Sequence, residues 1–254
     1  MNSISRASEF RTTCPSNKIW VDPSNMYVAV YIVGFIVLST AAPIAAFHSR
    51  HGAVNASHAA LAFFCGLNVL VCAWEIILGA HIDLIQREYR ALRARYAARP
   101  TAAAVALLGA RLGPLGALSP RFWSKIWSTY SLFDPSYANK ESFGFYIDVG
   151  NGLTTLAPCA LWVVYTTRCA ADGEAAVGAR ALGVVGLLAF YQMWYGTLLY
   201  FASFVVNRRY KPLGAVEAAL FVGLTNGVWF VFPLVGMRAA LALIFDGDYR
   251  WFLG

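Results

Sequence analysis

The chain alternates between long apolar stretches and shorter polar connections. Five stretches carry very few charged residues, and each is about 20 residues or longer, the length of helix that crosses roughly 30 Å of hydrocarbon. They are residues 26–47, 59–80, 143–167, 181–206 and 218–237. A helix satisfies every backbone N–H and C=O group inside the bilayer. The pattern therefore predicts an all-α integral membrane protein, a bundle of five transmembrane helices.

The connection between the second and third stretches, residues 83–142, is much longer than the others. A structureless loop of this length would be unusual in a compact fold. Its first part, residues 86–95, is expected to extend the second helix beyond the membrane. Residues 101–119 are apolar but are interrupted by Arg111 and by the Gly- and Pro-containing segment 113–116. An interfacial or re-entrant piece, or plain disorder, is expected there rather than a sixth span.

Composition favours a single membrane domain. Hydrophobic residues make up 59% of the chain and charged residues 13%, with a mean hydropathy of +0.55. These values leave no room for a separate soluble domain of any size. We therefore expect a flexible tail over residues 1–25, the five-helix domain over residues 26–245 and a C-terminal tail over residues 246–254.

The net charge of +7 is unevenly distributed. Fifteen of the 20 Lys and Arg residues fall in the N-terminal tail and in the connections 83–142 and 207–213, which a five-span chain places on one side. The positive-inside rule then predicts a cytoplasmic N-terminus. No basic run with interleaved aromatic residues indicates a nucleic-acid surface. The five cysteines form no CxxC pair, and no histidine is spaced with them for zinc.

Two carboxylic acids interrupt the apolar stretches, Glu75 in the second and Asp148 in the third. An ionisable group in hydrocarbon is costly and usually faces the bundle interior. Burial disfavours the charged form, and a neutral acid can donate a proton. At helical spacing Asn151 and Thr155 share a face with Asp148. Glu75 could instead form a hydrogen bond across the bundle that serves only helix packing, and the Asp148 side chain could extend to the membrane–water interface. The two acids together favour an intramembrane site.

Two further stretches carry polar or aromatic candidates. Asn226 and Trp229 lie one turn apart in the fifth, and an indole face is the best aromatic partner for a cation. Alternatively, both residues pack between helices. Gln192 and Tyr195 share a face of the fourth stretch with Gly196, a pattern typical of a helix contact, and we count both as candidate substrate-binding residues.

Four blocks of the chain resemble the emopamil-binding protein family, whose members include membrane sterol 8,7-isomerases (the EXPERA group). The blocks are Trp127-Ser128-Thr129-Tyr130 with Asp134 and Ser136-Tyr137; Asp148 with Leu161-Trp162-Val163-Val164; Gln192-x-x-Tyr195-Gly196-x-x-Leu199-Tyr200-Phe201; and Asn226-x-x-Trp229-x-x-x-Pro233. The resemblance covers roughly residues 57–245, except about thirty residues of the long connection. Each block is weak singly, and their order and spacing make the signal fairly specific.

The resemblance implies catalytic roles for Glu75, Asp148, Asn226 and Trp229, and a pocket position for Tyr130. Three departures stand out. The family's histidine one turn before the second-helix acid is Val71 here, with Asn68 one further turn back, and Asn68 is added to the candidate binding residues. The third-helix glutamate is the shorter Asp148. The threonine one turn after it is Asn151, which with Thr155 is expected to contact substrate.

The sequence as a whole predicts an intramembrane isomerase that moves a double bond in a sterol or related polycyclic terpenoid. We expect Asp148 to act as acid and Glu75 as base, with no metal or organic cofactor. The expected partners are this lipid substrate and membrane lipids, and small residues in the fourth and fifth stretches permit a homodimer. The resemblance implies the endoplasmic reticulum. A membrane terpenoid cyclase, a non-catalytic sterol- or lipid-binding relative and a structural membrane protein remain alternatives.

Overall fold

The computed structural model describes residues 25–168 and 178–253 and has the expected five long apolar helices. The first four are α1 (Val28–His51), α2 (Ala56–Ala80), α7 (Phe143–Arg168) and α8 (Ala179–Val206). The fifth is one continuous helical run through α9 (Ala215–Glu217), the π-helical segment η2 (Ala218–Leu224) and α10 (Thr225–Asp246). The predicted all-α membrane bundle is confirmed. The fifth span begins three residues earlier than predicted and ends at Asp246 rather than at residue 237.

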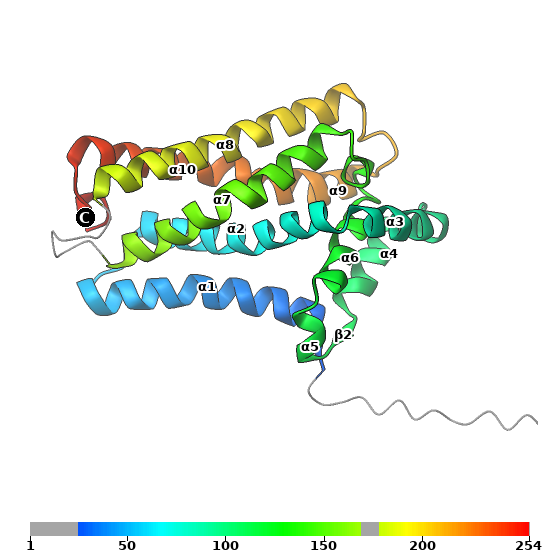
Figure 1. Ribbon diagram of the computed structural model, residues 1–254, viewed down its shortest axis with the longest axis horizontal. Helices are drawn as coiled ribbons and strands as arrows, with labels where there is room; N and C mark the ends of the chain where they lie inside the picture. Colours follow the sequence, from blue (N-terminus) through cyan, green and yellow to red (C-terminus); the bar gives the residue numbers. More distant parts are fainter. Residues whose placement is uncertain (1–24, 169–177, 254) are drawn as a thin grey trace, which may run out of the picture.

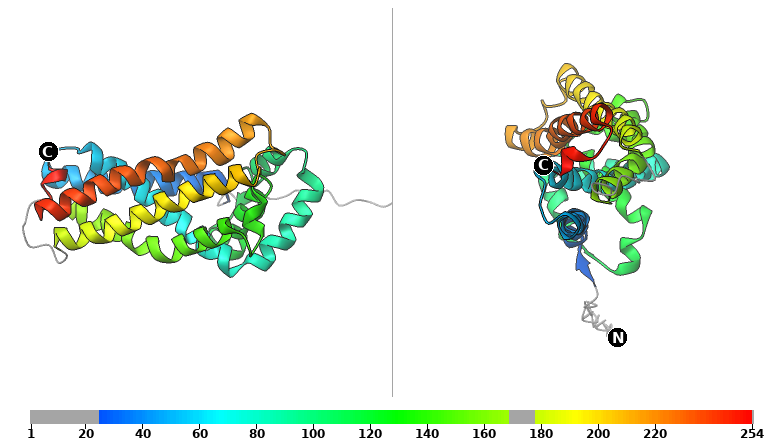
Figure 2. Two further views of the ribbon diagram at one scale, coloured as in Figure 1. Left: turned by 90° about the horizontal axis from the view of Figure 1, so that it is seen from above. Right: turned by 90° about the vertical axis from the view of Figure 1, so that its left-hand side faces the viewer.

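Four of the long helices form the compact part of the bundle. Helix α2 packs along α7, and α8 packs along α10. Helix α1 contacts α2 and α7 at the edge of the bundle (Figures 1 and 2). Val28 and Phe47 are its buried residues, whereas apolar side chains such as Val33 and Leu38 are exposed. An apolar helix with so little protein around it is suited to a lipid surrounding.

The connection between α2 and α7 folds into a cap of short elements at one end of the bundle (Figure 1). They are α3 (Ile82–Tyr96), α4 (Pro100–Leu108), β2 (Arg111–Leu112), α5 (Pro114–Ala117), α6 (Pro120–Tyr130) and η1 (Pro135–Ala138). The two-residue strand β1 (Met26–Tyr27), just before α1, pairs antiparallel with β2. A short three-residue helix, η3 (Arg250–Phe252), follows α10.

One expectation for this connection was wrong. Residues 82–96 form a separate helix, because the backbone leaves the helical conformation at His81, with φ −118° and ψ 21°. As expected, the apolar residues 101–119 do not form a sixth span. Of the alternatives left open, disorder is excluded, because these residues are divided among α4, β2 and α5. Their breaks coincide with Gly109 and with the Gly113-Pro114 pair, where glycine and proline end or restart helices.

Asp134 ties the cap to the bundle. Its side chain is fully buried and accepts hydrogen bonds from the backbone N–H of Ser136 and from the Tyr200 hydroxyl on α8, at 3.0 and 2.8 Å. It also pairs with Arg209, just beyond α8, at 3.0 Å. These bonds hold the α6–η1 segment against α8, with Tyr137 packed on Tyr200.

Candidate functional site

The two acids lie where α2 and α7 approach each other closely. A Cβ placed on Gly152 of α7 would lie 2.8 Å from the Cβ of Glu75 and 2.9 Å from the carbonyl oxygen of Cys72, so no side chain fits between the helices there. Asp148 precedes Gly152 by one helical turn and therefore faces the same helix pair.

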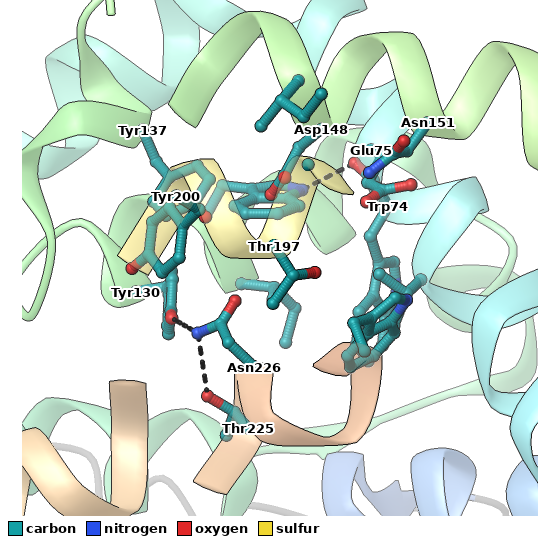
Figure 3. A pocket seen from close by; sticks show the side chains of 16 residues that line it. Trp74, Glu75, Tyr130, Tyr137, Asp148, Asn151, Thr197, Tyr200, Thr225 and Asn226 are labelled. Carbon is teal, nitrogen blue, oxygen red and sulfur yellow. Dashed lines mark hydrogen bonds between the residues drawn. The ribbon is translucent and has the colours of Figure 1, made fainter. Parts of the chain in front are cut away.

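Glu75 and Asp148 face one cavity of about 170 Å³ at the cap end of the bundle (Figure 3). The cavity is bounded by α2, α6, η1, α7, α8 and the fifth span. Its lining residues are Val71, Trp74, Glu75, Ile126, Trp127, Tyr130, Tyr137, Ile147, Asp148, Asn151, Gly196, Thr197, Tyr200, Thr225, Asn226 and Trp229.

Glu75 is the more enclosed acid. Glu75 as a whole is 3% exposed. Its Oε2 atom is buried and has no hydrogen-bond partner among residues 25–168 and 178–253. A buried polar atom that lacks a partner is costly and calls for an explanation. A bound molecule that exchanges a proton with this oxygen would supply one. Asp148, on the neighbouring helix α7, is half-buried.

A polar pair from the cap and the fifth span forms another wall. The Asn226 amide donates to the Tyr130 hydroxyl at 2.9 Å (Figure 3). It also donates to the Val222 carbonyl at 2.9 Å. Burial raises the pKa of Tyr130 to about 12, so its hydroxyl stays protonated near neutral pH. Burial also raises the pKa of Tyr137 well above its ordinary value. Both phenols therefore offer neutral O–H groups to the cavity.

Indole rings supply much of the remaining surface. The Trp229 N–H donates to Asn68 Oδ1 at 2.7 Å, and Phe64 meets the Trp229 ring edge-on with centroids 6.0 Å apart. The Trp127 N–H donates to the Trp74 carbonyl at 2.6 Å, which fixes α6 against α2. With their N–H groups engaged, Trp229 and Trp127 leave mainly carbon surface for a ligand.

Six of the residues singled out from the sequence line this cavity: Glu75, Asp148, Asn226, Trp229, Tyr130 and Asn151. Three others stand behind the lining. Asn68 and Thr155 are bonded to each other at 3.1 Å, and Gln192 donates to Asn151 Oδ1 at 2.9 Å and to Thr154 at 2.6 Å.

Tyr195 does not line the cavity, contrary to expectation. It is 45% exposed and stacks on Tyr191 at the bundle surface. The neighbouring Gly196 faces inward, because a Cβ there would lie 2.8 Å from Ile147 of α7. Successive helical residues are rotated by about 100°, so packing Gly196 against α7 turns Tyr195 outward.

Several lining residues had no role in the sequence-based interpretation. Trp127, Tyr137 and Tyr200 lie within the quoted blocks, so these motifs held a signal for them. Trp74, Thr197 and Thr225 had none, because only the rotation of each helix in the bundle turns them inward. Val71, where the resemblance implies a histidine, also lines the cavity and carries an apolar side chain.

Within the part of the chain that the structure describes, no group of three His, Cys, Asp or Glu side chains is arranged to hold a metal ion. No protein-family model, curated protein or solved structure matches the chain. The candidate site therefore rests on its own geometry and on the resemblance of its motifs.

Proposed function

We propose that the protein is an intramembrane isomerase that moves a carbon–carbon double bond in a sterol or related polycyclic terpenoid. The observation that carries the proposal is the shared cavity. Glu75 of α2 and Asp148 of α7 lie far apart in sequence, yet both face the same small, largely apolar space. The resemblance to the emopamil-binding protein family supports the same assignment.

The chemistry requires one acid and one base. The Asp148 carboxylic acid gives its proton to one alkene carbon, and the π electrons form the new C–H bond, which leaves a tertiary carbocation. The Glu75 carboxylate removes a proton from a carbon next to the cation, and that C–H pair becomes the new π bond. The product is an isomer. Before the next turnover Glu75 releases its proton to solvent and Asp148 takes up a proton from solvent.

The cavity favours the cation in two ways. The Trp229 face offers negative electrostatic potential to a positive carbon, an interaction that strengthens when water is excluded. Fixed dipoles and charges in a dry site need no reorganisation during the reaction. The alkene is a weak base, so proximity to a positioned acid supplies a large share of the rate.

The size of the cavity suggests how a polycyclic molecule would bind. A cavity of ~150 Å³ holds a benzene-sized ligand, so about 170 Å³ suits the reacting ring rather than the whole molecule. Thr225 is an exposed member of the lining and marks a side on which the rest of the ligand would leave the cavity.

One observation favours a second candidate, a sterol- or lipid-binding relative without turnover. Val71 replaces the family's histidine at the cavity wall, which removes one titratable group. The presence of both acids, Glu75 and Asp148, favours an enzyme over a non-catalytic binding protein. A cyclase, which also begins with protonation by a buried acid, differs from the isomerase in its substrate.

The proposal also includes a cellular membrane and an orientation in it. We place the protein in the membrane of the endoplasmic reticulum, following the resemblance, with the N-terminus in the cytoplasm. The Arg-rich helix α3 and the start of α1 lie at the same end of the bundle (Figure 1). The loop with Arg208 and Arg209 follows α8 at that end, so most of the basic residues gather on one side, which supports a cytoplasmic N-terminus.

The test is incubation of the purified protein, in detergent or nanodiscs, with a cyclic sterol alkene and separately with a linear terpenoid epoxide. An isomerase converts the first and leaves the second. Glu75→Gln and Asp148→Asn should each abolish conversion, while the exposed Glu141→Gln serves as the control. Consumption of the epoxide alone would favour the cyclase, and binding of the sterol without conversion would favour the non-catalytic relative.

A further inference from the structure

Asn68 lies behind the cavity at the meeting point of three helices. It is 1% exposed and is not a lining residue. Its side chain contacts Trp229 on α10, Thr155 and Cys159 on α7, and Cys72 one turn further along α2. A polar side chain this enclosed needs its hydrogen bonds satisfied locally.

The bonding pattern allows one orientation of the Asn68 amide. An indole N–H is a donor only, so the atom 2.7 Å from Trp229 Nε1 must be the carbonyl oxygen. The amide nitrogen then points to α7 and donates to Thr155 Oγ1 at 3.1 Å. The Thr155 hydroxyl donates to the Asn151 carbonyl at 2.9 Å, so its oxygen is free to accept.

This arrangement determines how the Trp229 ring sits in the cavity. Rotation of the ring would break the bond to Asn68 and leave a buried N–H unpaired, which costs more than the bond itself contributes. It would also remove the ring from its edge-on contact with Phe64. Asn68 is held in turn by α7, so the ring orientation is set by three helices together.

We propose that Asn68 is a positioning residue that keeps the Trp229 indole face toward the reacting carbon. The inference rests on the proposed isomerisation. An aromatic ring attracts a cation over its face but presents positive potential at its edge. A rotated indole would therefore lose its attraction for the carbocation without blocking substrate entry. Asn68 acts through Trp229 and not, as the sequence suggested, by touching the substrate.

Asn68→Leu tests the role, because leucine has a similar size and cannot accept a hydrogen bond. We expect kcat to fall about tenfold, the change for one lost buried hydrogen bond. KM should stay within about twofold, since the lost interaction acts on the transition state. Thr167→Val is the matched control. It removes another buried bond between α2 and α7, the 3.0 Å contact with His58, away from the cavity.

Repeating the Asn68 substitution in a protein that already carries Trp229→Phe distinguishes the positioning role of Asn68 from a general role in packing. In Trp229→Phe the ring has no N–H to bond, so adding Asn68→Leu should cause no further loss of kcat. An equal loss in both backgrounds would overturn the positioning role. Asn68→Val provides the same comparison if N68L does not accumulate in membranes.

A spectroscopic readout keeps this inference distinct from the proposed function. In ¹⁵N-labelled protein in micelles, the Trp229 indole N–H signal is assigned by its loss in Trp229→Phe. Asn68→Leu should move that signal, and Thr167→Val should not. An unmoved signal in an active enzyme would overturn the inference and leave the isomerase standing. A moved signal in a protein that converts no substrate would sink the isomerase, and with it the catalytic role of Asn68.

Discussion

Gly152 on α7 lies against Glu75 on α2 so closely that a Cβ at position 152 would be 2.8 Å from the Glu75 Cβ. This contact brings the two acid-bearing helices together and places Glu75 and Asp148 on one cavity. The site thus depends on the absence of a side chain as well as on the presence of the acids.

Gly152→Ala should therefore separate α2 from α7. Its Cβ would meet backbone as well as side-chain atoms, so the clash cannot be relieved by a rotamer change, and we expect a loss of about 1–3 kcal/mol in stability. Sterol binding should weaken with it. Gly150→Ala, two residues away with open space around it, is the control. Thermal unfolding in detergent measures both, and equal melting temperatures would contradict the proposed close contact.

The Asn226–Tyr130 bond should matter to ligand binding. Tyr130→Phe removes the hydroxyl that accepts from the Asn226 amide, so that amide keeps its bond to the Val222 carbonyl but loses its bond to the cap. We expect affinity for a sterol to fall about fivefold, the effect of roughly 1 kcal/mol. Tyr146→Phe, on an exposed ring of α7, should leave affinity unchanged. If Tyr130→Phe bound the sterol as tightly as Tyr146→Phe, Tyr130 would have no part in ligand binding.

The cap should depend on Asp134. Asp134→Ala leaves Arg209 without its carboxylate and Tyr200 without its acceptor. Breaking a buried pair from one side costs about 3–5 kcal/mol, so the variant should unfold at a markedly lower temperature. The exposed pair of Asp83 with Lys140 offers the comparison, since Asp83→Ala should cost about 1 kcal/mol or less. A similar loss for both would show that the buried pair does not anchor the cap.

Orientation can be read from tagged protein in sealed microsomes. With the N-terminus in the cytoplasm and five spans, protease added outside should remove an N-terminal tag and spare a C-terminal one. Detergent should expose both. Protection of the N-terminal tag alone would reverse the proposed orientation and the assignment of the cap to the cytoplasmic side.

Much of the architecture was predictable, because hydrophobic length alone decides which segments can cross a bilayer. The acids Glu75 and Asp148 were identifiable for the same reason, since charge is rare in such segments. The cap was not predictable: α4 and α5 are short, and they pack mainly against α1, α3 and α6, which lie elsewhere in the sequence. The rotation of each helix about its own axis was not predictable from the sequence either. Tyr195 looked like a site residue until Gly196 was seen to pack on Ile147, whereas Trp74 and Thr197 gave no signal.

The central claim is that two carboxyl groups exchange protons with one bound alkene. It is tested most directly by running the conversion in D₂O and analysing the product by mass spectrometry. The account predicts an isomer that carries one solvent deuterium at a carbon of the original double bond, and no conversion by Glu75→Gln. A rearranged product without deuterium, or undiminished turnover by Glu75→Gln, would contradict it.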